Sequence, residues 1–267
     1  MVKRMMSALA ILLLSLPLGL AQVKPVKSEV PAFDRKSGER KSSAINPFVV
    51  GEKLNYEASW SSFIVAGELT LETKERGNFD GVDGFHITAQ AQSVGLVSVL
   101  GYKVKDTYES FIDASTLKPF RAEKRTRHKS KTDQASVRID HERGVAEFDN
   151  GKTLDVPPDT YDLAGLIYAI RAMDFTSGKP KTFTLLEDEK LYPLSIEPGK
   201  KEKLELKSGK YQVISISTKA IGKRSEDPYN LRIYITDDER RLPVLITASP
   251  SWGEVRVELT SFSGTRK

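Results

Sequence analysis

KLNYEASWSSFIVAGELTLE, residues 53–72, decides the fold class of this chain, because apolar and polar side chains alternate through most of it. Leu54, Tyr56, Ala58 and Trp60 fall on one face of an extended segment, opposite charged and small polar residues. A period of two predicts a half-buried antiparallel strand. The pattern recurs at 85–91, 211–216, 231–235 and 255–259, with turn sequences such as Asn150-Gly151 between the segments. We therefore predict a mostly β domain of about a dozen strands.

Residues 159–173 break this pattern and predict a helix. Asp159–Asp162 resembles a capped helix start, and apolar residues then recur at helical spacing at Leu163, Leu166, Ile167 and Ile170. The opposite side is also largely apolar, so this helix should be buried all round. A curved sheet needs an element to fill its concave face. We expect an open, strongly coiled antiparallel sheet, or half-barrel, wrapped around one central α-helix.

Arg171, near the end of this helix, has two interpretations. It either complements the negative end of the helix dipole at the surface, or it is buried and holds a carboxylate or a ligand headgroup. Ser93–Gly101 is a second exception to the alternation, because its apolar residues form a cluster without a period. It is either a buried crossover or an apolar lip at the mouth of a cavity.

The N-terminus predicts export. Lys3 and Arg4 precede the apolar run Ala8–Leu16, and Gly19-Leu20-Ala21 offers small residues before a cut. We interpret residues 1–21 as a signal peptide cleaved near Ala21, with an uncleaved anchor as the alternative. Cleavage would leave no transmembrane helix in the mature chain and would place the protein in the periplasm or outer cell envelope.

The charge of the chain separates into regions. Residues 22–47 are rich in Lys, Ser and Pro and read as a disordered polar linker, either a tether or a weak polybasic patch. Residues 48–267 form a single β-rich domain in which 33 bases balance 33 acids. The net charge of +5 is therefore carried by residues 1–47, and we do not expect nucleic acid as a partner of the neutral domain.

Within the neutral domain, Lys118–Lys131 carries seven bases and one acid. Arg121, Arg125, Arg127, Lys129 and Lys131 would project from one face of a strand. The segment is either a solvated hairpin or charge-protected edge strand, or a strip that docks anionic envelope material such as lipid phosphates or acidic polysaccharide.

The sequence contains no recognisable catalytic or metal-binding constellation. G-x-S-x-G, H-E-x-x-H, phosphate-loop and G-x-G-x-x-G motifs are absent, and the chain has no cysteine and only three histidines. The acidic clusters Glu187-Asp188-Glu189 and Asp237-Asp238-Glu239 read as solvated turns. We expect no catalytic residues, no metal and no cofactor.

Several short motifs in order resemble a known family. They are Gly51-Glu52-x-Leu54-x-Tyr56, Ala66-Gly67, Asp106-x-Tyr108-x-Ser110, Asp162-Leu163 with Tyr168 and Arg171, Leu242-Pro243-Val244 and Gly253-x-Val255. The set is similar to the bacterial exported family catalogued as domain of unknown function 3108. The resemblance implies an envelope protein with an open coiled sheet around a helix, and it implies no activity. In outline this shape is similar to periplasmic carriers whose half-barrels hold acyl chains.

Three functions remain open. The first is a non-catalytic envelope protein that binds an amphipathic or acyl-chain ligand, with an anionic headgroup meeting Arg125, Arg127 or Arg171. The second is an assembly protein with a filled core that docks anionic glycan or protein partners through Arg121, Arg125, Arg127 and Lys129. The third, which has least support, is a hydrolase of envelope polymers. For the first, the expected ligand-binding residues are Trp60, Leu69, Leu163, Ile167, Tyr168 and Arg171.

Overall fold

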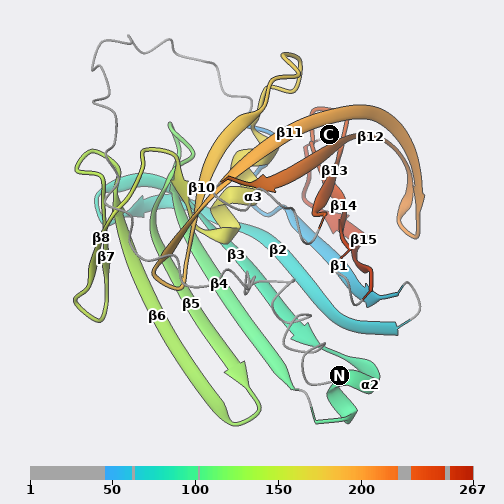
Figure 1. The fold of residues 1–267 in the computed structure, drawn as a ribbon, viewed down its shortest axis with the longest axis horizontal. Helices are drawn as coiled ribbons and strands as arrows, with labels where there is room; N and C mark the ends of the chain where they lie inside the picture. The colour runs from blue at the N-terminus through green and yellow to red at the C-terminus, as the bar shows by residue number, and fades with distance from the viewer. Residues whose placement is uncertain (1–45, 62–63, 102, 222–229, 250–252, 267) are drawn as a thin grey trace.

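Fifteen strands form one sheet in the computed structural model, which describes residues 46–61, 64–101, 103–221, 230–249 and 253–266 (Figure 1). The first eight strands are β1 (Lys53–Trp60), β2 (Ile64–Phe79), β3 (Val82–Ser93), β4 (Val104–Asp113), β5 (Pro119–His128), β6 (Lys131–Asp140), β7 (Val145–Phe148) and β8 (Thr153–Asp155). The others are β9 (Thr160–Tyr161), β10 (Lys181–Glu187), β11 (Lys190–Leu206), β12 (Gly209–Ala220), β13 (Arg232–Thr236), β14 (Pro243–Ala248) and β15 (Val255–Ser263). The predicted signal peptide, and the predicted linker up to residue 45, lie outside the described residues.

The sheet is open, and its strand order is β8-β7-β6-β5-β4-β3-β2-β1-β15-β14-β13-β12-β11-β10-β9. Every neighbouring pair is antiparallel except β9 and β10, which are parallel. Pairing of β1 with both β2 and β15 joins the two ends of the domain at the middle of the sheet. The prediction of a mostly β, open antiparallel sheet is therefore confirmed.

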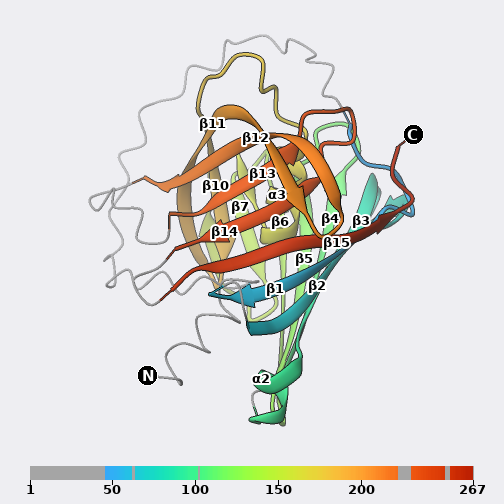
Figure 2. The ribbon, with the colours of Figure 1, turned by 90° about the vertical axis from the view of Figure 1, so that its right-hand side faces the viewer.

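The described residues contain two short helices rather than one, so the predicted single central helix is not confirmed. They are α2 (Gly95–Val99) and α3 (Leu163–Arg171). The longer α3 lies within the curve of the sheet and contacts β3, β4, β9 and β10 (Figure 2). Its first turn is capped by Asp162, which accepts hydrogen bonds from the backbone N–H groups of Ala164 and Gly165.

The core lies on two sides of α3. One cluster joins Ala164 and Tyr168 to β1–β4, and the other joins Leu166 and Ile170 to β10–β13. The alternating faces predicted from sequence explain this placement: the apolar face of each strand turns inward, and α3 separates the two halves of the interior.

The two ends of the sheet approach each other without pairing. Lys152 Nζ lies 2.7 Å from Glu189 Oε2, so the β7–β8 turn and the β10–β11 turn are joined by an ion pair. A small apolar cluster of Ile139, Ala146 and Leu186 packs across the same gap. The seam between the ends of the sheet is thus closed at some points by side chains and left open at others.

Candidate functional site

A hollow with a volume of about 540 Å³ lies at this seam. It opens between the inner face of β4–β6, the first residues of α3 and the β10–β11 turn. Its apolar walls come from different parts of the chain: Ala122, Val137, Phe148, Leu163 and Leu186. Volumes of 300–1,000 Å³ are usual for small-molecule sites.

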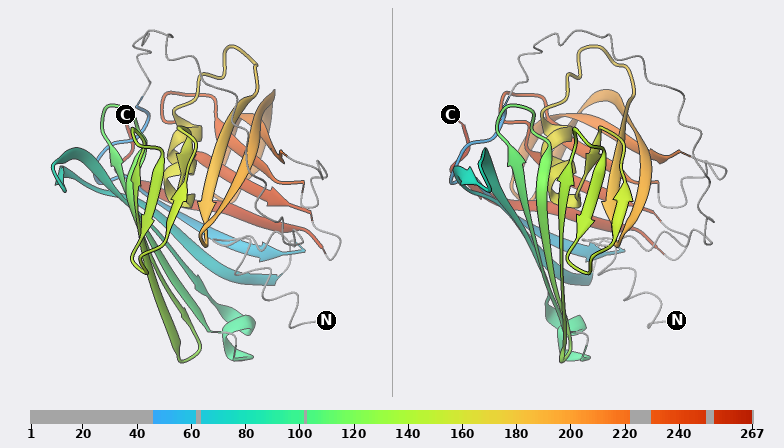
Figure 3. Two further views of the ribbon diagram at one scale, coloured as in Figure 1. Left: turned by 60° about the vertical axis from the view of Figure 1, so that its left-hand side comes forward. Right: turned by 90° about the vertical axis from the view of Figure 1, so that its left-hand side faces the viewer.

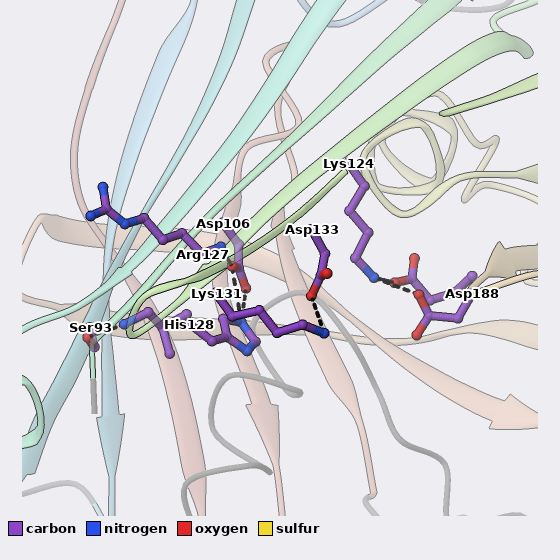
Figure 4. Close-up of polar contacts among 10 residues, drawn as sticks. Ser93, Asp106, Lys124, Arg127, His128, Lys131, Asp133 and Asp188 are labelled. Atoms are coloured by element: carbon purple, nitrogen blue, oxygen red, sulfur yellow. Dashed lines mark hydrogen bonds and ion pairs between the residues drawn. The ribbon is translucent and has the colours of Figure 1, made fainter. Parts of the chain in front are cut away.

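The ionisable side chains along the cleft are mostly acidic. Lys124 is the single base among its lining residues, against five acids that do not lie on the outer face of β4 and β5: Asp149, Asp162, Glu187, Asp188 and Glu189. Lys124 Nζ bonds Glu187 and lies 2.8 Å from Asp188 Oδ1 (Figure 4), and it lies 5.3 Å from the centre of the Tyr108 ring. The base is therefore already neutralised by carboxylates.

Glu187 is a buried carboxylic acid in the wall of the cleft. It ends the buried strand β10, and only 9% of the residue is exposed. Burial raises the pKa of Glu187 to about 7, although the charge and hydrogen bond of Lys124 oppose the shift. The prediction that residues 187–189 form a solvated turn is wrong for Glu187. Asp188 and Glu189 do form the turn, with φ values of 47° and 58°.

Replacement of Glu187 by Gln should remove a pH dependence of stability. Between pH 4.5 and 7 the folded protein holds a proton that the unfolded chain releases, so the free energy of unfolding falls as pH rises through this window. Urea denaturation at pH 5 and pH 8 should show a loss of the order of 2 kcal/mol in the parent and little of it in Glu187→Gln. Asp188→Asn is the matched control and should keep the parent's slope; an unchanged slope in Glu187→Gln would contradict the assignment.

Asp162 links the cleft to the helix. Besides capping α3, it accepts a hydrogen bond of 2.6 Å from Ser110 Oγ on β4. Burial raises the pKa of Asp162, and the hydrogen bonds from Ser110, Gly165 and Ala164 oppose this shift. Since both groups are buried and satisfied by one another, they fix the start of α3 against the sheet.

The structure separates the residues predicted to bind a ligand. Leu163 lines the cleft. Leu69 and Tyr168 are buried in the core, and Ile167 packs against it. Trp60 lies at the far end of β1, against Ala66 and Val255. Four of these apolar residues therefore belong to packed regions outside the cleft.

Arg171 is buried, as one of its two sequence interpretations required, and it holds a carboxylate of the protein itself. Its Nη1 lies 2.6 Å from Glu52 Oε1 and its Nη2 lies 2.9 Å from Glu52 Oε2. Nε and Nη2 also donate to the backbone carbonyls of Arg241 and Arg240. Both side chains of the ion pair are fully buried, so Arg171 does not face the cleft.

The predicted basic strip is not one row. Arg121, Arg125 and Arg127 share the outer face of β5, because Ala122 and Lys124 between them face the core and cleft. Lys129 lies in the β5–β6 turn with φ of 58°, and Lys131 pairs with His128 on the opposite face. β5 pairs with both β4 and β6, so it is not an edge strand.

The outer-face arginines have local partners. Arg121 lies 2.8 Å from Asp80 Oδ2 and stacks over the Phe111 ring at 3.7 Å. Arg125 lines a smaller hollow of about 240 Å³ together with Glu109 and Glu123. An anion at that hollow would meet two carboxylates as well as Arg125, which disfavours it as a headgroup site.

The fold and cleft define a class: a mostly β protein with one open, strongly curved antiparallel sheet and a ligand-sized opening at its seam. The chain belongs to the family described as "Protein of unknown function (DUF3108)", whose family model matches residues 55–260. No curated protein matches the chain.

Solved structures resemble the chain at low sequence identity. A β-barrel-like protein of the domain of unknown function DUF1849 from Brucella abortus has a TM-score of 0.56 at 13% identity, covering 81% of this chain and 98% of that one. A DUF1089 family protein from Pseudomonas aeruginosa has a TM-score of 0.44 at 12% identity, covering 70% and 93%. A candidate lipoprotein from Parabacteroides distasonis has a TM-score of 0.36 at 7% identity, covering 82% and 98%. The first of these likenesses supports the fold.

Proposed function

We propose that this protein is an exported, non-catalytic binding protein that takes an amphipathic small molecule into the cleft at the seam of its sheet. The observation that carries the proposal is the cleft itself. It has a volume of about 540 Å³ and is lined by both apolar and charged side chains. Export rests on the N-terminal sequence. Absence of catalysis rests on the lack of catalytic motifs in the sequence.

The charge of the rim sets the sign of the ligand's polar end. Five carboxylates along the cleft, those of Asp149, Asp162, Glu187, Asp188 and Glu189, outnumber the two bases that neutralise some of them, Lys124 and Lys152. A cationic or hydrogen-bond-donating end would therefore be attracted, and an anionic headgroup would be repelled. The arginines expected to meet such a headgroup are either buried with Glu52 or on the outer face of β5. The proposal thus keeps an amphipathic ligand and reverses the expected charge of its head.

Filling the cleft should abolish binding. Ala135 lies opposite Lys124 on the inner face of β6, so Ala135→Trp would place an indole in the opening. We expect native mass spectrometry of the purified protein to show a small molecule that the variant loses. Thr132→Trp is the matched control, since it is exposed on the other face of the same strand and outside the cleft.

Two results would contradict this proposal. One is a parent protein that carries no small molecule and shows no shift in melting temperature across a panel of cationic, neutral and anionic amphiphiles. The other is binding that survives Ala135→Trp as well as it survives Thr132→Trp. A preference for anionic amphiphiles would retain a binding function but overturn the role given to the acidic rim.

A further inference from the structure

The end of the molecule that carries α2 exposes an unusual amount of apolar surface. Val99 is 81% exposed and Leu100 is 68% exposed. Ile64 and Val65, at the start of β2 beside α2, are also exposed. These are four of the six large apolar residues found exposed in the described part of the chain. The sequence-based alternative of a buried crossover at 93–101 is therefore wrong for Val99 and Leu100.

This apolar end is held in place by the fold. Val97 packs against buried Ala66 and Val255 on the inner side of α2. Val94 N–H donates to the carbonyl of Ala66 at 3.1 Å, which ties the entry to α2 onto β2. Figure 3 shows β3–β6 projecting beyond the rest of the sheet with α2 at their end. Val99 and Leu100 therefore lie on a projecting part of the molecule that is packed and hydrogen-bonded to β2.

Basic residues surround the apolar pair. Segments 94–105 and 125–132 contain six bases: Lys103, Lys105, Arg125, Arg127, Lys129 and Lys131. Two acids follow directly, Asp106, which is buried, and Asp133, which pairs with Lys131 at 3.1 Å. All six bases are exposed. The backbone N–H of Lys129 donates to the carbonyl of Lys103 at 2.9 Å, so the β5–β6 turn lies beside the segment that follows α2. We call α2, Leu100, Lys103 and the β5–β6 turn the hairpin tip.

We propose that the hairpin tip docks on an anionic lipid bilayer. Val99 and Leu100 insert among the acyl chains near the surface, while Lys103, Lys105 and Lys129 lie at the level of the lipid phosphates. Long basic side chains suit this level because their stems are apolar and their heads remain solvated. Neither contribution alone gives stable attachment, but apolar insertion combined with a basic patch does.

The positive charge of the hairpin tip favours an anionic bilayer as its binding partner. The predicted linker, residues 22–47, has three more bases than acids, so it does not complement a basic surface. No helix of the described residues is long and apolar enough to span a membrane. Attachment at the tip would be peripheral, and it is independent of the function proposed for the cleft.

A fluorophore at the tip tests the insertion directly. The chain has no cysteine, so Leu100→Cys introduces a single labelling site for an environment-sensitive dye. With vesicles of equal parts phosphatidylglycerol and phosphatidylcholine, we expect a blue shift and a several-fold rise in emission. Val50→Cys is the matched control because Val50 is exposed at the opposite end of β1 from the tip, and it should not respond. The labelled site reports only on its own surroundings, so the N-terminal apolar segment does not confuse the result.

Vesicle flotation of full-chain variants tests both contributions. Val99→Ser with Leu100→Ser should weaken partitioning about tenfold, since the two side chains supply the buried apolar area. Lys103→Gln with Lys129→Gln should weaken it on anionic vesicles. Controls are Val50→Ser with Ile221→Ser, and Lys203→Gln with Lys210→Gln, all exposed and distant in sequence from the tip.

Three results would overturn the proposal. The first is no dye response with anionic vesicles. The second is an equal response with pure phosphatidylcholine, which would exclude the role of the basic residues. The third is retention on dextran sulfate with no dye response to vesicles, which would make the tip a binding surface for anionic polymers instead.

Discussion

Replacing Glu52 with Gln should lower the free energy of unfolding by about 3–5 kcal/mol, because it leaves the Arg171 guanidinium charged, fully buried and without its carboxylate. The pair is bidentate, with N–O distances of 2.6 and 2.9 Å, and it joins the segment before β1 to the end of α3 across 119 residues of sequence. The backbone carbonyls of Arg240 and Arg241 accept hydrogen bonds from two further N–H groups of Arg171.

A double-mutant cycle would separate the interaction energy of Glu52 and Arg171 from the other effects of replacing each residue. Met at both positions removes two buried charges together, so Glu52→Met with Arg171→Met should cost less than Glu52→Gln alone. Urea denaturation followed by circular dichroism provides the measurement. Arg76→Gln is the control, since Arg76 and Asp83 form a bidentate pair at the surface and its loss should have little effect. Similar small losses in Glu52→Gln and Arg76→Gln would show that the buried pair does not stabilise the fold.

Local sequence signals predicted the parts of this fold that depend on neighbours in the chain. Alternation located the strands, and the stripe from Leu163 to Ile170 located α3 with Asp162 before it. The inward direction of the apolar faces followed from the same period. The short α2 was missed because five residues are too few to show a helical repeat.

The cleft is formed by residues that are far apart in the sequence, so local sequence patterns could not predict it. Lys124 on β5 meets Glu187 on β10 across 63 positions of sequence, although nine strands lie between β5 and β10 in the sheet. Glu187 ends an apolar strand and begins an acidic turn, so its sequence context fits a solvated residue as well as a buried one. The prediction of a single basic row was wrong for a different reason. It assumed one strand that continues past His128, whereas the chain turns at Lys129.

Tyr168→Ala should be the second strongly destabilising change, with an expected loss of about 3–5 kcal/mol. Tyr168 is fully buried between α3 and the β1–β4 half of the core, and its ring lies 4.7 Å from the ring of Phe48 in an edge arrangement. Truncation would leave a cavity between α3 and the sheet, and the hydrogen-bonded strands on the sheet side limit its collapse.

The hydroxyl of Tyr168 contributes much less than its ring. It accepts a hydrogen bond of 3.2 Å from Thr73 Oγ1, so Tyr168→Phe should cost about 1 kcal/mol. The two variants also test whether Tyr168 binds a ligand, as the sequence suggested. Because the cleft does not include Tyr168, the Phe variant should retain the cleft's small molecule in native mass spectrometry. Loss of that molecule in a stably folded Tyr168→Phe protein would place the ligand beside α3 rather than at the seam, and an Ala variant as stable as the Phe variant would show that the core closes around the missing ring.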